Sequence, residues 1–118
     1  MKNVLENLEL KRRDILETRK VLIELLKEIE ETVTNFQLES KLLFSVRELR
    51  SNCNINTMKI NEYENFMIKL ERVVHYIGNL EVFMDNNNEC KERLIKINNN
   101  YKILYYNLVE VVLILKEK

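Results

Sequence analysis

The chain has 118 residues, enough for one packed core and too few for two, so we expect a single domain over residues 1–118. Apolar residues make up 46% of the chain and charged residues 32%, a mixture typical of folded helical proteins and not of disordered ones. Basic and acidic residues number 19 each, which argues against a general nucleic-acid binder, because such a protein needs a basic face to neutralise phosphates.

The composition favours long helices. Proline is absent and glycine occurs once, at Gly78, so the two residue types that most often end a helix are nearly missing. Alanine is also absent, whereas asparagine, lysine and isoleucine are abundant. This bias indicates an AT-rich genome, such as that of a virus, a phage or a parasite.

Apolar side chains recur at every seventh position from the N-terminus, and a period of seven is typical of helices that pack through one face. These positions are Met1, Leu8, Ile15, Leu22, Ile29, Phe36 and Leu43. The pattern predicts a first helix over residues 2–50, about 70 Å long at a rise of about 1.5 Å per residue.

A competing feature lies inside this first helix. Residues 32–35 are weak helix formers, and Thr34 with Gln37 has the spacing of a capping box, which would start a new helix. A break near residue 34 would give four helices in place of three. We expect a continuous helix, because the heptad phase passes undisturbed from Ile29 through Phe36 to Leu43.

Residues 51–57 form the clearest loop, since serine and asparagine side chains compete with the helical backbone for hydrogen bonds. A second helix is predicted to begin near Thr57 or Asn61 and to pass through Gly78, because its apolar phase continues beyond the glycine. Its seam consists of Ile60, Tyr63, Met67, Leu70, Val74, Ile77 and Met84.

Residues 85–88 predict a second turn, after which Asn88 caps a third helix that runs to the end of the chain. The seam of this helix consists of Leu94, Ile97, Tyr101, Leu104, Leu108, Val111 and Leu115. The spacing continues across residues 98–100, so this asparagine run is predicted to lie on the helix surface. The fold class is therefore all-α, an elongated three-helix coiled-coil-like bundle in which an antiparallel helical hairpin packs on the long first helix.

The sequence offers no constellation of residues for catalysis. His75 is the only histidine and follows Glu71 by one helical turn, but two ligands do not make a metal site. A single glycine excludes a glycine-rich phosphate loop, and carboxylates such as Glu92 are spaced to pair with nearby cations such as Lys96 on the helix surface. We expect no catalytic, cofactor-binding or metal-binding residues, and hence no enzyme.

The two cysteines, Cys53 and Cys90, flank the second predicted helix, which would hold their thiols too far apart for a disulfide. We expect both to be reduced, buried beside the seam, and in a cytoplasmic or host-intracellular protein, with the nucleus as an alternative. A helix N-terminus would lower the pKa of Cys90, whereas burial would raise it. No signal peptide or membrane-spanning run is evident, so we expect no membrane partner.

Two features point towards protein partners. Arg12 and Arg19 occupy seam positions of the first helix, where either their stems lie along the seam with the charges in water or they dock onto an acidic surface. The segment from Ile103 to Leu115 is apolar on every side, which requires a central place in the bundle, a second molecule, or insertion at a membrane surface. The candidate interaction residues of this segment are Tyr105, Tyr106, Val109, Val112, Leu113 and Ile114.

These features favour a non-enzymatic protein–protein interaction module, a helical adaptor or subunit that forms homo-oligomers. In this hypothesis the long first helix overhangs the shorter hairpin and leaves apolar seam uncovered. The alternative is a small viral or phage inhibitor that blocks a host enzyme or nucleic-acid machine, and a nucleic-acid-binding helical protein is the third hypothesis.

Overall fold

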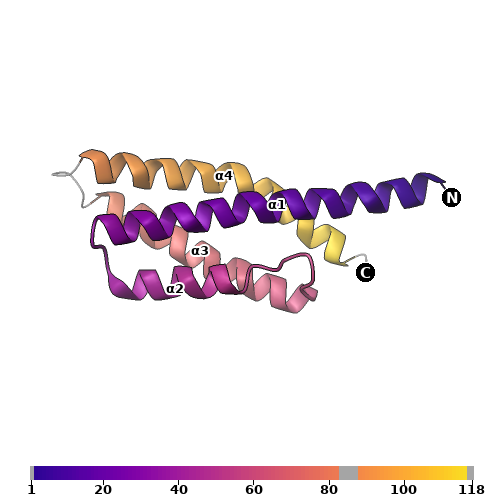
Figure 1. The fold of residues 1–118 in the computed structure, drawn as a ribbon, viewed down its shortest axis with the longest axis horizontal. Helices are drawn as coiled ribbons and strands as arrows, with labels where there is room; N and C mark the ends of the chain where they lie inside the picture. Colours follow the sequence, from indigo (N-terminus) through magenta and orange to yellow (C-terminus); the bar gives the residue numbers. More distant parts are fainter. Residues whose placement is uncertain (1, 83–87, 117–118) are drawn as a thin grey trace.

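The computed structural model of the protein describes the backbone of residues 2–82 and 88–116, and the side chains of residues 14–80 and 88–116. Within these ranges the chain is all-α, as the sequence predicts, and no strand occurs in them. The helices are α1 (Lys2–Asn35), α2 (Ser40–Ser51), α3 (Ile60–Val82) and α4 (Asn88–Lys116) (Figure 1). The molecule is elongated, with extents of 59 × 21 × 18 Å.

The four helices run up and down in turn, so that each is antiparallel to the next along the chain (Figure 1). α1 packs against α2 and α4, and α3 packs against the same two helices. Among the described residues each helix therefore has two neighbouring helices and presents its remaining circumference to the outside. The antiparallel pairing of α3 with α4 confirms the predicted hairpin.

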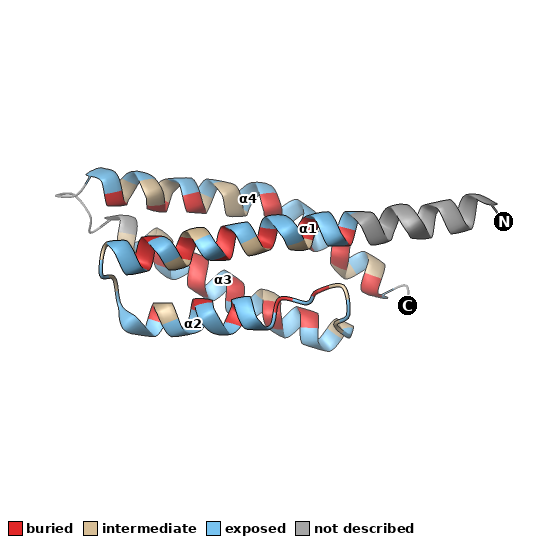
Figure 2. Cartoon of the chain, viewed as in Figure 1, coloured by how far each residue is buried: buried red, intermediate tan, exposed pale blue. Residues whose placement is uncertain are grey.

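The core lies where the four apolar stripes meet along the bundle axis (Figure 2). Every stripe follows the spacing of three and four residues that brings side chains onto one helix face. The largest fully buried side chains are Leu22, Leu26 and Ile29 of α1, Val46 of α2, Tyr63, Leu70 and Ile77 of α3, with Leu94, Ile97, Leu104 and Leu108 of α4, and Ile55 of the α2–α3 loop. Burial of each contributes about 1.5–3 kcal/mol to folding.

The prediction of one continuous helix over residues 2–50 is wrong, because α1 ends at Asn35 and α2 begins at Ser40. The backbone N–H of Leu38 donates to the carbonyl of Val33 at 2.9 Å, and that of Gln37 donates to Thr34 at 3.3 Å. This pair of bonds forms a Schellman motif, with Gln37 at its left-handed position (φ 51°). The break lies close to the alternative position, but Thr34 ends a helix and does not cap a new one.

The heptad phase that favoured continuity is coincidental beyond Ile29. That residue is fully buried, whereas Phe36 and Leu43 are only half-buried. α2 instead buries Leu42, Val46 and Leu49, which lie on a face set by its own start at Ser40. The first helix is therefore shorter than predicted, but its N-terminal end still extends beyond the other helices (Figure 1), where its side chains lie outside the described residues.

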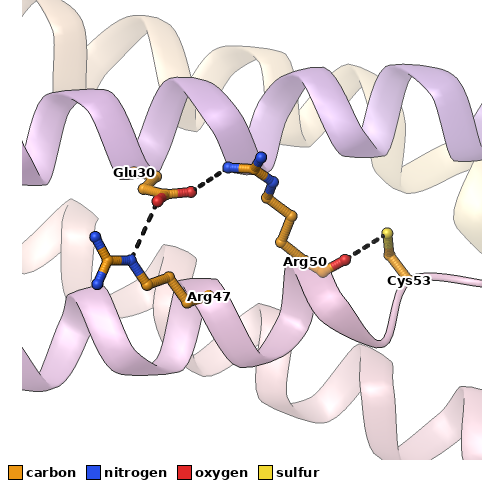
Figure 3. Close-up of polar contacts among 4 residues, drawn as sticks. All are labelled: Glu30, Arg47, Arg50 and Cys53. Carbon is orange, nitrogen blue, oxygen red and sulfur yellow. Dashed lines mark hydrogen bonds and ion pairs between the residues drawn. The ribbon is translucent and has the colours of Figure 1, made fainter.

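The short helix α2 is held against α1 by an ionic cluster on its surface (Figure 3). The carboxylate of Glu30 accepts a hydrogen bond from Nε of Arg47 at 3.2 Å and another from Arg50. Burial disfavours the charge on Glu30, but these two hydrogen bonds and the arginine charges outweigh it and lower the pKa of the carboxyl below its usual 4.5. The cluster joins α1 to α2 across the turn.

The starts of the next two helices agree with the sequence predictions. α3 begins at Ile60 and passes through Gly78, and α4 begins at Asn88 and passes through residues 98–100. Residues 52–59 lie between α2 and α3 without helical structure, as predicted for this loop. The predicted seam residue Met84 and residues 85–87 of the predicted second turn lie outside the described residues.

Candidate functional site

The C-terminal half of α4 has one face in the core and one face in solvent. Its inner stripe consists of the buried side chains Leu104, Leu108, Val111 and Leu115. α4 packs only against α1 and α3 within the described part of the chain, so the opposite side of this helix has no covering element. The interpretation that this apolar helix takes a central place in the bundle is therefore wrong.

Apolar side chains gather on this uncovered side. Of the ten large apolar side chains exposed in the described ranges, five lie on α4 between residues 103 and 113. Ile103 is 70% exposed, Tyr106 75% and Leu113 59%. We call the set the α4 surface, and it consists of Ile103, Tyr105, Tyr106, Val109 and Leu113. Figure 2 shows exposed residues along this part of α4.

Two charged residues flank the α4 surface. Lys102 and Glu110 are both exposed, and each lies four residues from Tyr106, on opposite sides along the helix. Glu110 lines a shallow hollow between α1 and α4 together with Asp14 and Glu17, so negative charge gathers at that end. The surface is thus apolar in its middle, basic towards its start and acidic towards its end.

A buried hydrogen bond fixes how this half of α4 faces. The hydroxyl of Tyr63, a fully buried side chain of α3, donates to the backbone carbonyl of Leu108 at 2.7 Å. The bond and the packing of Leu108 turn one side of α4 inward, and the side that bears Tyr106 and Leu113 therefore faces out. Burial also raises the pKa of the Tyr63 hydroxyl, since the charged form would lose its hydration.

Four of the six α4 residues singled out from the sequence, namely Tyr105, Tyr106, Val109 and Leu113, are exposed together on this helix. The other two, Val112 and Ile114, are half-buried and pack against the core. Ile103 belongs to the surface but was missing from the predicted set. Its place at the start of the all-round apolar segment is the feature that could have identified it.

Arg12 and Arg19 on the first helix form the other predicted interaction feature. Nη2 of Arg19 donates to Oδ1 of Asn54 at 2.9 Å, so Arg19 faces the loop between α2 and α3 and binds within its own chain. Its Nε atom is buried and has no hydrogen-bond partner among the described residues. The side chain of Arg12 lies outside the described residues.

The titratable residues considered for chemistry are dispersed. Cys53 and Cys90 are both buried and neither forms a disulfide, and burial raises the pKa of the Cys90 thiol despite the opposing charge of Arg93. Glu71 and His75 are exposed on α3. Among the described side chains, no group of three or more potential metal ligands comes together.

The surface pairing predicted for Lys96 is wrong. The ammonium group of Lys96 lies 3.6 Å from the carboxylate of Glu28 on α1. The predicted partner, Glu92, is instead a residue of α4, the helix that bears Lys96. Antiparallel packing of α1 against α4 brings Glu28 within reach, and sequence spacing alone does not reveal such a neighbour. The pair adds a polar contact to the α1–α4 interface.

A second hollow of about 380 Å³ lies between α2 and α3. Its apolar lining consists of Leu42, Leu49 and Val73, and Lys69 pairs with Glu48 at its rim at 3.3 Å. The volume is within the range of small-molecule sites, but both of these charged side chains are largely exposed to solvent. The paired charges suit a solvated groove between two helices.

Comparison with known proteins adds no relative, since no protein-family profile, no curated protein and no solved structure matches the chain. None of the described helices has the length and apolar character that crossing a bilayer requires. Function must therefore be argued from the α4 surface itself.

Proposed function

We propose that the protein is a non-enzymatic protein–protein interaction module, a helical subunit or adaptor that binds through the α4 surface. The observation that carries the proposal is the clustering of exposed apolar side chains on one helix, with Ile103, Tyr106 and Leu113 each more than half exposed. Scattered apolar residues are normal on protein surfaces, but a contiguous cluster with a charged rim is typical of interaction sites.

The amino acids of this cluster support the proposal. Tyrosine is enriched at interfaces because its ring supplies a large apolar area and its hydroxyl forms a hydrogen bond at the edge of the contact. Two adjacent tyrosines, Tyr105 and Tyr106, lie on the surface, and the ring of Tyr105 packs beside that of Tyr101 with centroids 6.0 Å apart. This contact reduces the entropy that Tyr105 would lose on binding.

Site-specific photocrosslinking tests the proposal. A benzophenone amino acid replaces Tyr106 in one version of the protein and Phe44 in another, because Phe44 on α2 is equally exposed at 76% but lies outside the cluster. In extracts of the source cells, we expect discrete protein adducts from position 106 and not from position 44. Substitution of Leu113 by serine in the position-106 version should remove these adducts, since it removes part of the same apolar surface.

Two outcomes would contradict the proposal. Equal adduct patterns from positions 44 and 106 would mean that the α4 surface does not bind proteins in preference to another exposed surface of the chain. Adducts from position 106 that survive the Leu113→Ser substitution would mean that the captured protein does not depend on the apolar cluster.

A further inference from the structure

We infer that the α4 surface binds a second copy of this chain, with the two α4 helices antiparallel about a two-fold axis at Tyr106. The inference rests on the proposed function and deepens it by naming the partner. It is carried by the spacing of the exposed side chains and by the positions of the two flanking charges.

The outer side of α4 has the spacing of a helix-packing seam. Lys102, Tyr106, Val109 and Leu113 follow one another at intervals of four, three and four residues, and all are exposed. The inner stripe of α4 has the same intervals, from Leu104 to Leu115, and packs within the bundle. A second seam on the outward side is therefore suited to another helix, which would pack on it in the same way.

The charges favour one orientation. In an antiparallel pair centred on Tyr106, Lys102 of each copy comes level with Glu110 of the other, since both residues lie four positions from the centre. The four-carbon stem of lysine lets its ammonium group reach across the seam. A parallel pair would instead place like charges opposite one another, at a cost in affinity.

The same register pairs apolar residues at the centre of the contact, whereas Leu113 comes level with Asn99 of the second copy. Tyr106 meets its own copy at the axis, and Ile103 comes level with Val109 of the second copy, because their positions are equally distant from residue 106. Glu110 shares its hollow with Asp14 and Glu17, so a lysine from the second copy enters a region of negative charge. The seam from residue 102 to residue 113 is about 16 Å long, which predicts a reversible dimer.

The experiment is a charge exchange followed by sedimentation equilibrium from low micromolar to millimolar concentration. The wild type should dimerise, and Lys102→Glu or Glu110→Lys alone should weaken the dimer about tenfold or more, because each places like charges opposite one another twice. The double variant Lys102→Glu with Glu110→Lys should restore dimerisation, since the opposite charges then meet again in exchanged places. Circular dichroism checks that every variant is folded.

Lys20→Glu serves as the matched control, because Lys20 is exposed on α1 and lies outside the α4 surface. It should leave dimerisation unchanged. A wild type that is monomeric throughout the concentration range, or a double variant that dimerises no better than the single ones, would overturn the inference. Adducts to a different protein from position 106, combined with a strictly monomeric chain, would reject the second copy while leaving the proposed interaction surface in place.

Discussion

At the scale of single residues, two buried or half-buried polar groups tie neighbouring helices together. Tyr63 joins α3 to α4 through its bond to the carbonyl of Leu108, and Glu30 joins α1 to α2 through Arg47 and Arg50. Both groups have pKa values displaced from normal, so both make the stability of the bundle depend on pH.

For Tyr63→Phe we expect a loss of about 1–2 kcal/mol in the free energy of unfolding at neutral pH, because a buried hydrogen bond disappears. The raised pKa of Tyr63 favours the neutral hydroxyl in the folded state, so its contribution is present below pH 10 and is lost as the pH rises above 10. Burial, with the charges of Glu71 and Tyr105, likewise raises the pKa of Tyr101 to about 12.

Urea denaturation at pH 7 and above pH 10 measures these effects. Wild type should lose stability with rising alkalinity, and Tyr63→Phe should lose less over the same interval. The exposed Tyr106 supplies the control substitution Tyr106→Phe. An alkaline slope that is identical in Tyr63→Phe and in wild type would show that this hydroxyl does not titrate with unfolding.

For Glu30→Gln we expect a loss of about 0.5–1 kcal/mol at neutral pH, the range for exposed pairs, because Arg47 and Arg50 remain 60% and 43% exposed. The pKa of Glu30 is depressed, so its contribution is present above pH 4.5 and is lost as the pH falls below that value. Thermal unfolding at pH 7 and at acid pH should therefore show the variant and wild type converging in acid. A difference that grows in acid would contradict this assignment.

At the scale of helices and turns, backbone conformation decides where elements begin and end. Gly78 lies inside α3 with an ordinary helical backbone, whereas Gln37 adopts a left-handed conformation that costs a non-glycine residue energy. The chain thus has its glycine where none is needed and lacks one where it would help. Two substitutions test this contrast.

Gly78→Ala should stabilise the protein by about 0.5–1 kcal/mol, since alanine loses less conformational entropy in a helix. A Cβ atom at this position would meet Nδ2 of Asn98 at 3.8 Å, an ordinary van der Waals contact. The midpoint of thermal unfolding should rise accordingly. A lower midpoint would mean that α3 and α4 approach more closely here than the structure indicates.

Gln37→Gly should also stabilise the protein, by about 0.5–1 kcal/mol, because glycine adopts the left-handed position of the Schellman motif without strain. Gln37→Ala keeps the strain and serves as the control, with a change near zero. Chemical denaturation of both variants distinguishes them. Equal effects of glycine and alanine would show that Gln37 does not hold its positive φ in solution.

At the scale of the whole molecule, the described helices leave apolar side chains on one side of α4 exposed to solvent. In the part of the chain that the structure describes, α4 has two neighbours, α1 and α3, and the α4 surface faces away from both. Residues of such a surface contribute to association and little to folding, since they stay in solvent in the folded monomer. Folding and association are therefore expected to respond to different substitutions.

The double substitution Tyr106→Ser with Leu113→Ser should change the free energy of unfolding by less than about 0.5 kcal/mol per site, the range for exposed positions. Leu108→Ala on the opposite side of the helix should cost about 2–5 kcal/mol, because it opens a cavity in the core. Denaturation at low protein concentration, where association is negligible, makes the comparison. A large destabilisation by the surface pair would place these side chains in the core.

Much of the fold and part of the site follow from the sequence. Apolar spacing identified α3 and α4 and the seam of α1 from Ile15 to Ile29, because a helix face must be apolar to be buried. The all-round apolar segment likewise gave four of the exposed α4 residues. The end of α1 was missed because its Schellman motif uses Gln37, and glutamine carries none of the preference for left-handed backbone that glycine would have revealed.

The sequence by itself determined that the chain is helical, where α3 and α4 begin, and that the end of α4 is too apolar for a single neighbour. Only the tertiary structure decided which side of α4 remains uncovered, that Arg19 donates a hydrogen bond to Asn54, and that Lys96 pairs with Glu28 of α1. The physical reason is that periodicity is a property of one helix, whereas cover and pairing depend on which other helices lie beside it.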